Sequence, residues 1–180
     1  TALWVSLSFF MVGFGVKSAL FPLHVWLPDA HSSAIAPSSA MLSSLAIKGY
    51  IIALLKVFYV AVGAEIITRL PITNILAVLG MLAIIAGALF ALAQDELKRR
   101  LAFSTVSQVG YIFLGIGLGN IQGLTGSFMH ILSHAITKAL LFLAAGSIIK
   151  RTGKTRISEM AGVGFEMPVT LGVFAVGSLS

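Results

Sequence analysis

The sequence contains no cysteine among its 180 residues. Cysteine thiolates hold iron–sulfur clusters and most structural zinc ions, and paired cysteines form disulfides, so these features are excluded within the chain. Charged side chains are also scarce, because they make up 10% of the residues against 58% that are hydrophobic, and the mean hydropathy is +1.02. This exceeds what a soluble domain needs for its core and indicates a protein that crosses a membrane several times.

Apolar runs near the spanning length of about 20 residues occupy most of the chain. They cover residues 2–21, 36–62, 72–93, 101–118 and 124–149. The runs are continuous rather than alternating, which favours helices over barrel strands. We therefore expect an all-α, polytopic transmembrane helix bundle with five full spans and the start of a sixth. Since the final run from Pro168 has only 13 residues and the chain starts at Thr1, we expect 1–180 to be a single fragment of a longer subunit.

The basic residues are distributed unevenly between the loops. Seven lie in the first, third and fifth loops and the turns beside them: Lys98, Arg99, Arg100, Lys150, Arg151, Lys154 and Arg156. The alternate regions, which include the end of the 36–62 run, hold Lys56 and Arg69. By the positive-inside rule, loops around 23–35, 94–100 and 150–167 are predicted to be cytoplasmic. Topology alone explains the basic cluster after Asp95, so we expect neither a phosphate ligand nor a nucleic-acid partner.

Apart from Lys56, which is counted above near the end of its run, three lysines fall inside predicted spans, namely Lys17, Lys48 and Lys138. A lysine at the centre of a membrane helix costs about 2.5–3.5 kcal/mol on insertion scales, so each one is a candidate functional residue. Lys138 lies about 16–20 Å along the axis from either end of its predicted span, too far to reach water easily. All six acidic residues lie in loops or at span ends, so the three lysines have no obvious carboxylate partner within the chain.

Lys138 shares one face of its predicted helix with His130 and His134, because the three are spaced by four residues. Each step rises about 6 Å, a distance suited to one bridging water. Since histidine titrates near neutrality, this row is predicted to carry protons. Two alternatives remain. A histidine pair can bind a metal or haem, although the neighbouring lysine disfavours a cation, and polar side chains can simply join helices.

The first span contains a signal for a broken helix. Gly13 and Gly15 precede Lys17, and Pro22 removes a hydrogen bond that the Ser18 carbonyl would accept. We expect a discontinuous helix near Lys17 to Pro22, a feature tolerated in membranes where it borders a polar cavity. The alternative is an ordinary proline kink with Lys17 near the interface.

Three motifs resemble one known family: GVKSALFPLHVWLPDAHSSA, LKRRLAFSTVSQVGY and HILSHAITKALLFLAAG. The chain is similar, over nearly its whole length, to the antiporter-like membrane subunits of respiratory complex I, Mrp-type cation/proton antiporters and membrane-bound hydrogenases. The resemblance covers helices seven to eleven and the beginning of twelve. The stretch AIAPSSAML and a lysine at position 48 look closer to the Mrp and hydrogenase subunits than to the largest complex I subunit.

This resemblance implies a polar axis that carries protons through the bilayer along Lys17, Lys48, His130, His134 and Lys138. It implies that Lys17 pairs with a glutamate on an earlier helix, and that a charged residue on the twelfth helix completes the exit, both outside this chain. It also implies no cofactor in this chain, with flavin and iron–sulfur clusters in partner subunits if the complex is redox-driven.

Three functions remain open from the sequence. The first is proton translocation in a redox-driven NADH-quinone oxidoreductase or hydrogenase-type complex, as a transport subunit without its own redox centre. The second is an Mrp-type Na⁺/H⁺ antiporter subunit. The third is a structural membrane subunit without transport. In each case the expected partners are the lipid bilayer and other membrane subunits, in the cell (inner) membrane of a prokaryote.

Overall fold

A computed structural model describes residues 2–179, and within them it contains helices and no β-strand. The first half of the chain comprises α1 (Ala2–Lys17), α2 (Trp26–Ser33), α3 (Ala36–Met41), η1 (Leu42–Ala46), α4 (Ile47–Lys56), η2 (Val57–Gly63), α5 (Ala64–Arg69) and α6 (Ile72–Ala93). The second half comprises α7 (Leu97–Gly117), α8 (Ile121–Thr152), η3 (Ile157–Glu159), α9 (Val163–Glu166) and α10 (Pro168–Leu179). The prediction of an all-α helix bundle is confirmed.

Three helices within residues 2–179 are long and apolar enough to cross a membrane, namely 36–69, 72–93 and 121–152, with 34, 22 and 32 residues. The predicted span over 101–118 corresponds to α7, which has 21 residues but carries a basic first turn and a polar middle. The first predicted span is shorter than expected because α1 ends at Lys17 after 16 residues.

The predicted break after Lys17 is confirmed. α1 ends there, the chain turns through residues 18–25, and α2 begins at Trp26. The turn is closed by the Trp26 indole, whose Nε1 donates at 2.8 Å to the Val16 carbonyl, which also accepts from the Ala19 backbone N–H at 3.2 Å. Ala19 in this turn is buried and has φ +57°, a conformation uncommon for a residue with a side chain.

The helix that carries Lys48 runs from α3 through α4 and contains two π-helical segments, η1 and η2, and it is followed by α5 after Gly63, whose φ is +99°. Pro37 lies in its first turn, where a proline costs no helical hydrogen bond. The first π segment, η1, ends directly before α4, where the Ile47 N–H bonds to the Leu42 carbonyl five residues back. Such widened turns release carbonyls from the regular pattern and are frequent at functional sites.

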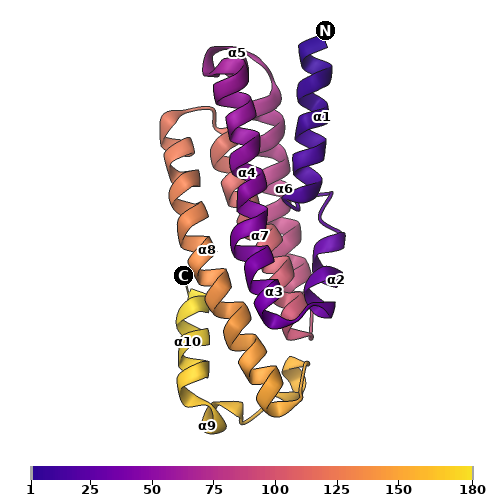
Figure 1. Cartoon of the computed structure of the whole chain (residues 1–180), viewed down its shortest axis with the longest axis vertical. Helices are drawn as coiled ribbons and strands as arrows, with labels where there is room; N and C mark the ends of the chain where they lie inside the picture. The colour runs from indigo at the N-terminus through magenta and orange to yellow at the C-terminus, as the bar shows by residue number, and fades with distance from the viewer. Residues whose placement is uncertain (1, 180) are drawn as a thin grey trace.

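α7 lies at the centre of the bundle, against α6, α8 and α2 (Figure 1). α6 and α7 approach closely because glycines face each other. A Cβ on Gly110 would lie 2.7 Å from the Gly80 carbonyl, and one on Gly87 would lie 2.6 Å from the Ser107 nitrogen. Small residues at such contacts are the usual way in which membrane helices pack.

Three loops meet at one end of the bundle, which we call the basic end: residues 23–35, 94–100 and 150–167. Two backbone hydrogen bonds join the 95–97 segment to the 155–158 segment. The Leu97 N–H donates to the Thr155 carbonyl at 3.0 Å, and the Ile157 N–H donates to the Asp95 carbonyl at 2.8 Å. An Arg99–Asp29 ion pair joins the loop at 94–100 to α2. These are the loops predicted from charge to share one side of the membrane, and α9 lies at the same end (Figure 1).

Candidate functional site

Lys138 lies in the middle of α8 and its side chain is held by α7. The residue is 3% exposed. Its ammonium nitrogen donates to the Leu101 carbonyl at 3.1 Å and to the Ser104 hydroxyl at 2.5 Å. A buried ammonium needs such partners because leaving a buried charged donor unsatisfied is costly. The structure therefore places Lys138 in a defined polar niche between α7 and α8.

The same Leu101 carbonyl also accepts a hydrogen bond from the Thr105 hydroxyl, at 3.0 Å. Thr105 Oγ1 in turn lies 2.9 Å from Ser43 Oγ in η1. A hydroxyl has one proton to donate, and that of Thr105 goes to Leu101, so the Ser43 hydroxyl is the donor in this pair. Both Ser43 and Thr105 have no exposed surface. Two fully buried hydroxyls thus connect the helix of Lys48 with the niche of Lys138.

Lys48 lies at the other end of this connection. It is 3% exposed, and its ammonium donates to the Ser43 carbonyl within the π-helical turn. The charge of Lys48 also acts on Lys138 across the bundle. Because charges interact strongly where water is scarce, a change of charge on one lysine affects the proton affinity of the other.

His130 and His134 extend the polar site along α8. Their rings stack with centroids 5.8 Å apart and an interplanar angle of 16°, which matches the spacing predicted from one turn of helix. His134 is 4% exposed, whereas His130 is half-buried beside Tyr111, with ring centroids 5.8 Å apart.

The two histidines and Lys138 line one cavity of about 360 Å³. Its wall is completed from three helices by Arg100, Leu101, Ser104, Gln108, Ser133, Thr137, Leu141, Phe174, Gly177 and Ser178. Within the described residues, His134 has no hydrogen-bond partner at either ring nitrogen and His130 has none at Nε2. The two rings border this cavity, and an imidazole nitrogen that meets water can exchange a proton with it.

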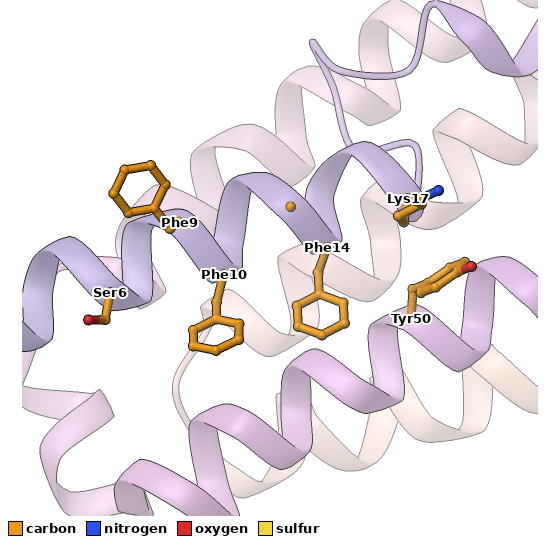
Figure 2. Close-up of a pocket in the computed structure, with 7 residues that line it drawn as sticks. Ser6, Phe9, Phe10, Phe14, Lys17 and Tyr50 are labelled. Carbon is orange, nitrogen blue, oxygen red and sulfur yellow. The ribbon is translucent and has the colours of Figure 1, made fainter.

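Lys17 is not joined to these residues. It is exposed at the end of α1, and it makes no hydrogen bond or ion pair with residues 2–179. Lys17 and Tyr50 lie at one end of a groove of about 550 Å³ that is otherwise lined mainly by aromatic side chains of α1 (Figure 2). Phe10 and Phe14 point from α1 toward the helix that carries Tyr50, and their rings stack at 6.1 Å.

The acidic residues lie away from the buried lysines, as the sequence predicted. The ion pairs within residues 2–179 join Arg69 to Glu65 and join Arg99 to Asp29 and Glu96, all near helix ends. No group of three or more His, Asp or Glu side chains in this part of the chain is placed to hold a metal ion.

Sequence reasoning missed the residues that connect the lysines. These residues are small and polar and lie within apolar runs, namely Ser43, Ser104 and Thr105. Their polarity inside such runs is the sequence feature that could have identified them. The role of Lys98 was also missed. It was counted as a topology signal, but its half-buried ammonium donates to the carbonyls of Ala34 at 2.8 Å and Ser32 at 3.3 Å at the end of α2.

The whole chain matches one family of membrane proteins. The family described as NADH:quinone oxidoreductase/Mrp antiporter, TM, matches residues 1–180. Among curated relatives, NADH-quinone oxidoreductase subunit N of Desulforudis audaxviator is 42% identical over 179 residues, covering 98% of this chain and 35% of the relative. NAD(P)H-quinone oxidoreductase chain 4 1 of Synechococcus elongatus is 41% identical over 184 residues, covering 99% of this chain and 34% of the relative. The chain thus spans about a third of the length of these relatives.

Solved structures agree with this match. The Mrp complex from Dietzia sp. contains a chain that is 30% identical and superposes with a TM-score of 0.91, covering 99% of this chain and 33% of that one. A chain of the membrane-bound sulfane sulfur reductase, an archaeal respiratory membrane complex, is 30% identical with a TM-score of 0.86, covering 98% of this chain and 36% of that one. The protein is therefore an integral membrane protein and belongs to the NADH:quinone oxidoreductase/Mrp antiporter transmembrane family.

Proposed function

We propose that this chain is part of a proton-translocating subunit of a redox-driven membrane complex of the NADH-quinone oxidoreductase or hydrogenase type. The names of the curated relatives and the respiratory complex among the structural neighbours support this proposal. Electron transfer, with its flavin and iron–sulfur clusters, would occur in partner subunits. The chain would move protons when charged groups next to its lysines, in other parts of the protein or complex, change their charge.

The observation that carries the proposal is the buried polar connection from Lys48 to Lys138. The Ser43 and Thr105 hydroxyls lie in this connection, and a hydroxyl can accept one proton while donating another. The carbonyls of Ser43 and Leu101 accept from the two ammonium groups and hold them in place. Protons would pass between the lysines through the hydroxyls and water, and then along the cavity of His134 and His130.

Lys17 would exchange protons at the start of this route. Its exposed position at a helix break, beside a groove, leaves its ammonium accessible to a partner from another part of the protein. A carboxylate on an earlier helix would pair with it there. Movement or neutralisation of that carboxylate would change the proton affinity of Lys17, because an opposite charge nearby favours the ammonium form.

A second candidate function is Na⁺/H⁺ antiport in an Mrp-type complex. The superposition on the Mrp complex with a TM-score of 0.91 favours it. Both functions use the same proton route and differ in the driving force, which would be a reductant in one case and a sodium gradient in the other. Both also require other membrane subunits as partners.

The subunit would lie in the cell membrane of a prokaryote with its basic end in the cytoplasm. Seven basic residues lie at this end or beside it, and the loops that carry them are bonded to one another. Cytoplasmic loops carry such an excess of Lys and Arg.

Proton movement in inverted membrane vesicles tests the proposal. The vesicles would contain the full-length subunit in its complex and would be supplied first with NADH or another reductant and then with an imposed sodium gradient. Proton uptake driven by reductant supports the redox-driven complex, and uptake driven only by sodium supports the antiporter. The absence of proton movement under both conditions, in vesicles that hold the assembled complex, would contradict both.

A further inference from the structure

His31, in α2, is a buried histidine whose ring has no partner in the described part of the chain. It has no exposed surface, and neither Nδ1 nor Nε2 makes a hydrogen bond within residues 2–179. Its backbone carbonyl accepts from the Ser39 hydroxyl at 3.3 Å. Each unsatisfied buried polar group costs about 1–3 kcal/mol, so a histidine at this position requires a reason beyond packing.

The ring of His31 lies close to the site of Lys138. It stacks on Phe142 of α8, with ring centroids 4.4 Å apart and an interplanar angle of 20°. Phe142 follows Lys138 by four residues, so it lies on the same face of α8 about 6 Å along the axis. His31 is therefore about one helical turn from Lys138, on the side of the basic end.

Three lysines act electrostatically on His31. The charges of Lys138, Lys48 and Lys98 all act on its ring. Lys98 is the outermost of the three because it is half-buried and bonds to the carbonyls at the end of α2. His31 thus lies between a partly accessible lysine at the basic end and the buried lysine of the polar site.

His24 provides a contrast within the same segment. It is also buried, at 6% exposed, but its ring packs among Phe21, Phe90 and Phe103 at centroid distances of 5.3, 6.2 and 6.2 Å. One His24 ring nitrogen, Nδ1, has no hydrogen-bond partner within residues 2–179, but the ring also bonds to the Pro22 backbone, whereas neither nitrogen of His31 has a partner. His31 differs in that its ring stacks on Phe142 of α8, four residues after Lys138, and feels the charges of three lysines.

We propose that His31 is a proton-relay residue that connects water at the basic end of the bundle with Lys138. This inference rests on the proposed function, which it deepens by naming a residue on the way to the buried lysine. In the forward step, the free ring nitrogen takes a proton from water, and the other nitrogen then gives its proton through water to the Lys138 amine. The ring returns to the neutral form with its tautomer exchanged, and no other reactant is consumed.

The test measures proton uptake in inverted vesicles that contain the full-length subunit in its complex. The variants are His31→Gln, His31→Ala, the matched control His24→Gln and the reference Lys138→Ala, all at equal assembled amounts. Glutamine keeps hydrogen-bonding groups but does not ionise. We expect His31→Gln to lower the initial rate at least about tenfold, because a positioned proton-transferring side chain contributes about 10²- to 10⁴-fold. His24→Gln should stay within about twofold of the unmodified protein, because the His24 ring lies among three phenylalanine rings and, within residues 2–179, has no ring contact with the residues of the Lys138 niche.

Chemical rescue separates a relay from a packing role. Added imidazole should restore part of the rate of His31→Ala, because a small base can carry the proton that the missing ring carried, and it should not restore Lys138→Ala. Equal rates for His31→Gln and the unmodified protein, while Lys138→Ala is inactive, would overturn the relay and leave the proposed function intact. Full activity of Lys138→Ala would overturn both the relay and the proposed route through Lys138, because the relay delivers its proton to that lysine.

Discussion

The Ser43 and Thr105 hydroxyls, separated by 62 positions in the sequence, lie 2.9 Å apart in the centre of the bundle. Ser43 belongs to the π-helical turn before Lys48, and Thr105 belongs to α7, one turn after the carbonyl that holds Lys138. The pair is therefore the point where the helix of one buried lysine is joined to the niche of the other.

Replacement of Thr105 by valine should interrupt this link with little change in volume. We expect the proton-uptake rate in vesicles to fall about tenfold, since the loss of a hydrogen bond of about 1.4 kcal/mol corresponds to a factor of ten. Ser43→Ala should have a similar effect, and the double variant should be no slower than either single variant, because one connection is lost in each case.

Thr125→Val is the matched control for this prediction. The Thr125 hydroxyl bonds to the carbonyl four residues back in its own helix, as that of Thr105 does, but it lies at an exposed position near the start of α8. Its replacement should leave the rate unchanged. Equal losses for Thr125→Val and Thr105→Val would show that the effect comes from helix stability rather than from the link.

Gly110→Ala should weaken the packing of α6 on α7. The added methyl would lie 2.7 Å from the Gly80 carbonyl and 2.8 Å from the Ile84 nitrogen, so the backbones must separate. Overpacking of this kind costs about 1–3 kcal/mol, and we expect a lower thermal midpoint for the purified complex. Gly126→Ala, where a methyl meets no atom within 4 Å, should be neutral or slightly stabilising. A midpoint that is the same in both variants would contradict the close approach at Gly110.

The loop junction at the basic end should depend on pH through Asp95. The Ser158 hydroxyl, at 2.7 Å, and the Ser158 backbone N–H, at 3.0 Å, hold the pKa of the Asp95 carboxyl below its ordinary value. Because the folded pKa is lowered, this contribution to stability is present above the unfolded pKa of about 3.9 and is lost as the pH falls through the folded value.

Hydrogen exchange of the 155–158 segment in the assembled complex measures this contribution. We expect Ser158→Ala to speed exchange near neutral pH, and we expect the difference from the unmodified protein to vanish once Asp95 is protonated in both. A difference that persists unchanged into strongly acidic conditions would mean that the carboxylate does not hold the loop.

The Lys98 side chain should stabilise the packing of α2 more than the side chain of its neighbour Arg99 does. Lys98 is half-buried and donates to two carbonyls at the end of α2, and hydrogen bonds to charged groups contribute about 1.5–3 kcal/mol each. The Arg99–Asp29 pair has 40% and 69% of its side-chain surfaces exposed, where ion pairs contribute about 0–1 kcal/mol. Lys98→Gln should therefore speed hydrogen exchange in α2 more than Arg99→Gln does. The reverse order would assign the anchoring of α2 to the surface ion pair.

The parts of the fold that depend on local pattern could be predicted from the sequence. Continuous apolar runs predicted the helices, Gly13, Gly15 and Pro22 predicted the break that occurs after Lys17, and four-residue spacing placed the rings of His130 and His134 5.8 Å apart. Each of these follows from the geometry of a single helix.

The connections between helices could not be predicted in this way. The contact of Ser43 with Thr105 depends on how a π-helical turn is oriented toward α7. The spacing of residues along the sequence predicts neither the π-helical turn nor its orientation. The same reason applies to His31, whose position over Phe142 joins elements more than 100 residues apart. Lys98 resembled its basic neighbours in composition, and only the packed structure separates the anchoring lysine from the surface arginine.

The central claim, that protons pass through the buried polar site, is tested most directly by proton uptake in inverted vesicles with Lys138→Ala. Equal amounts of assembled complex would be verified by immunoblot, and Lys150→Ala, an exposed lysine on the same helix, would serve as the control. We predict that Lys138→Ala loses proton uptake while Lys150→Ala keeps it. Unchanged uptake in the assembled Lys138→Ala complex would contradict the route and would leave the polar row of α8 as a packing feature.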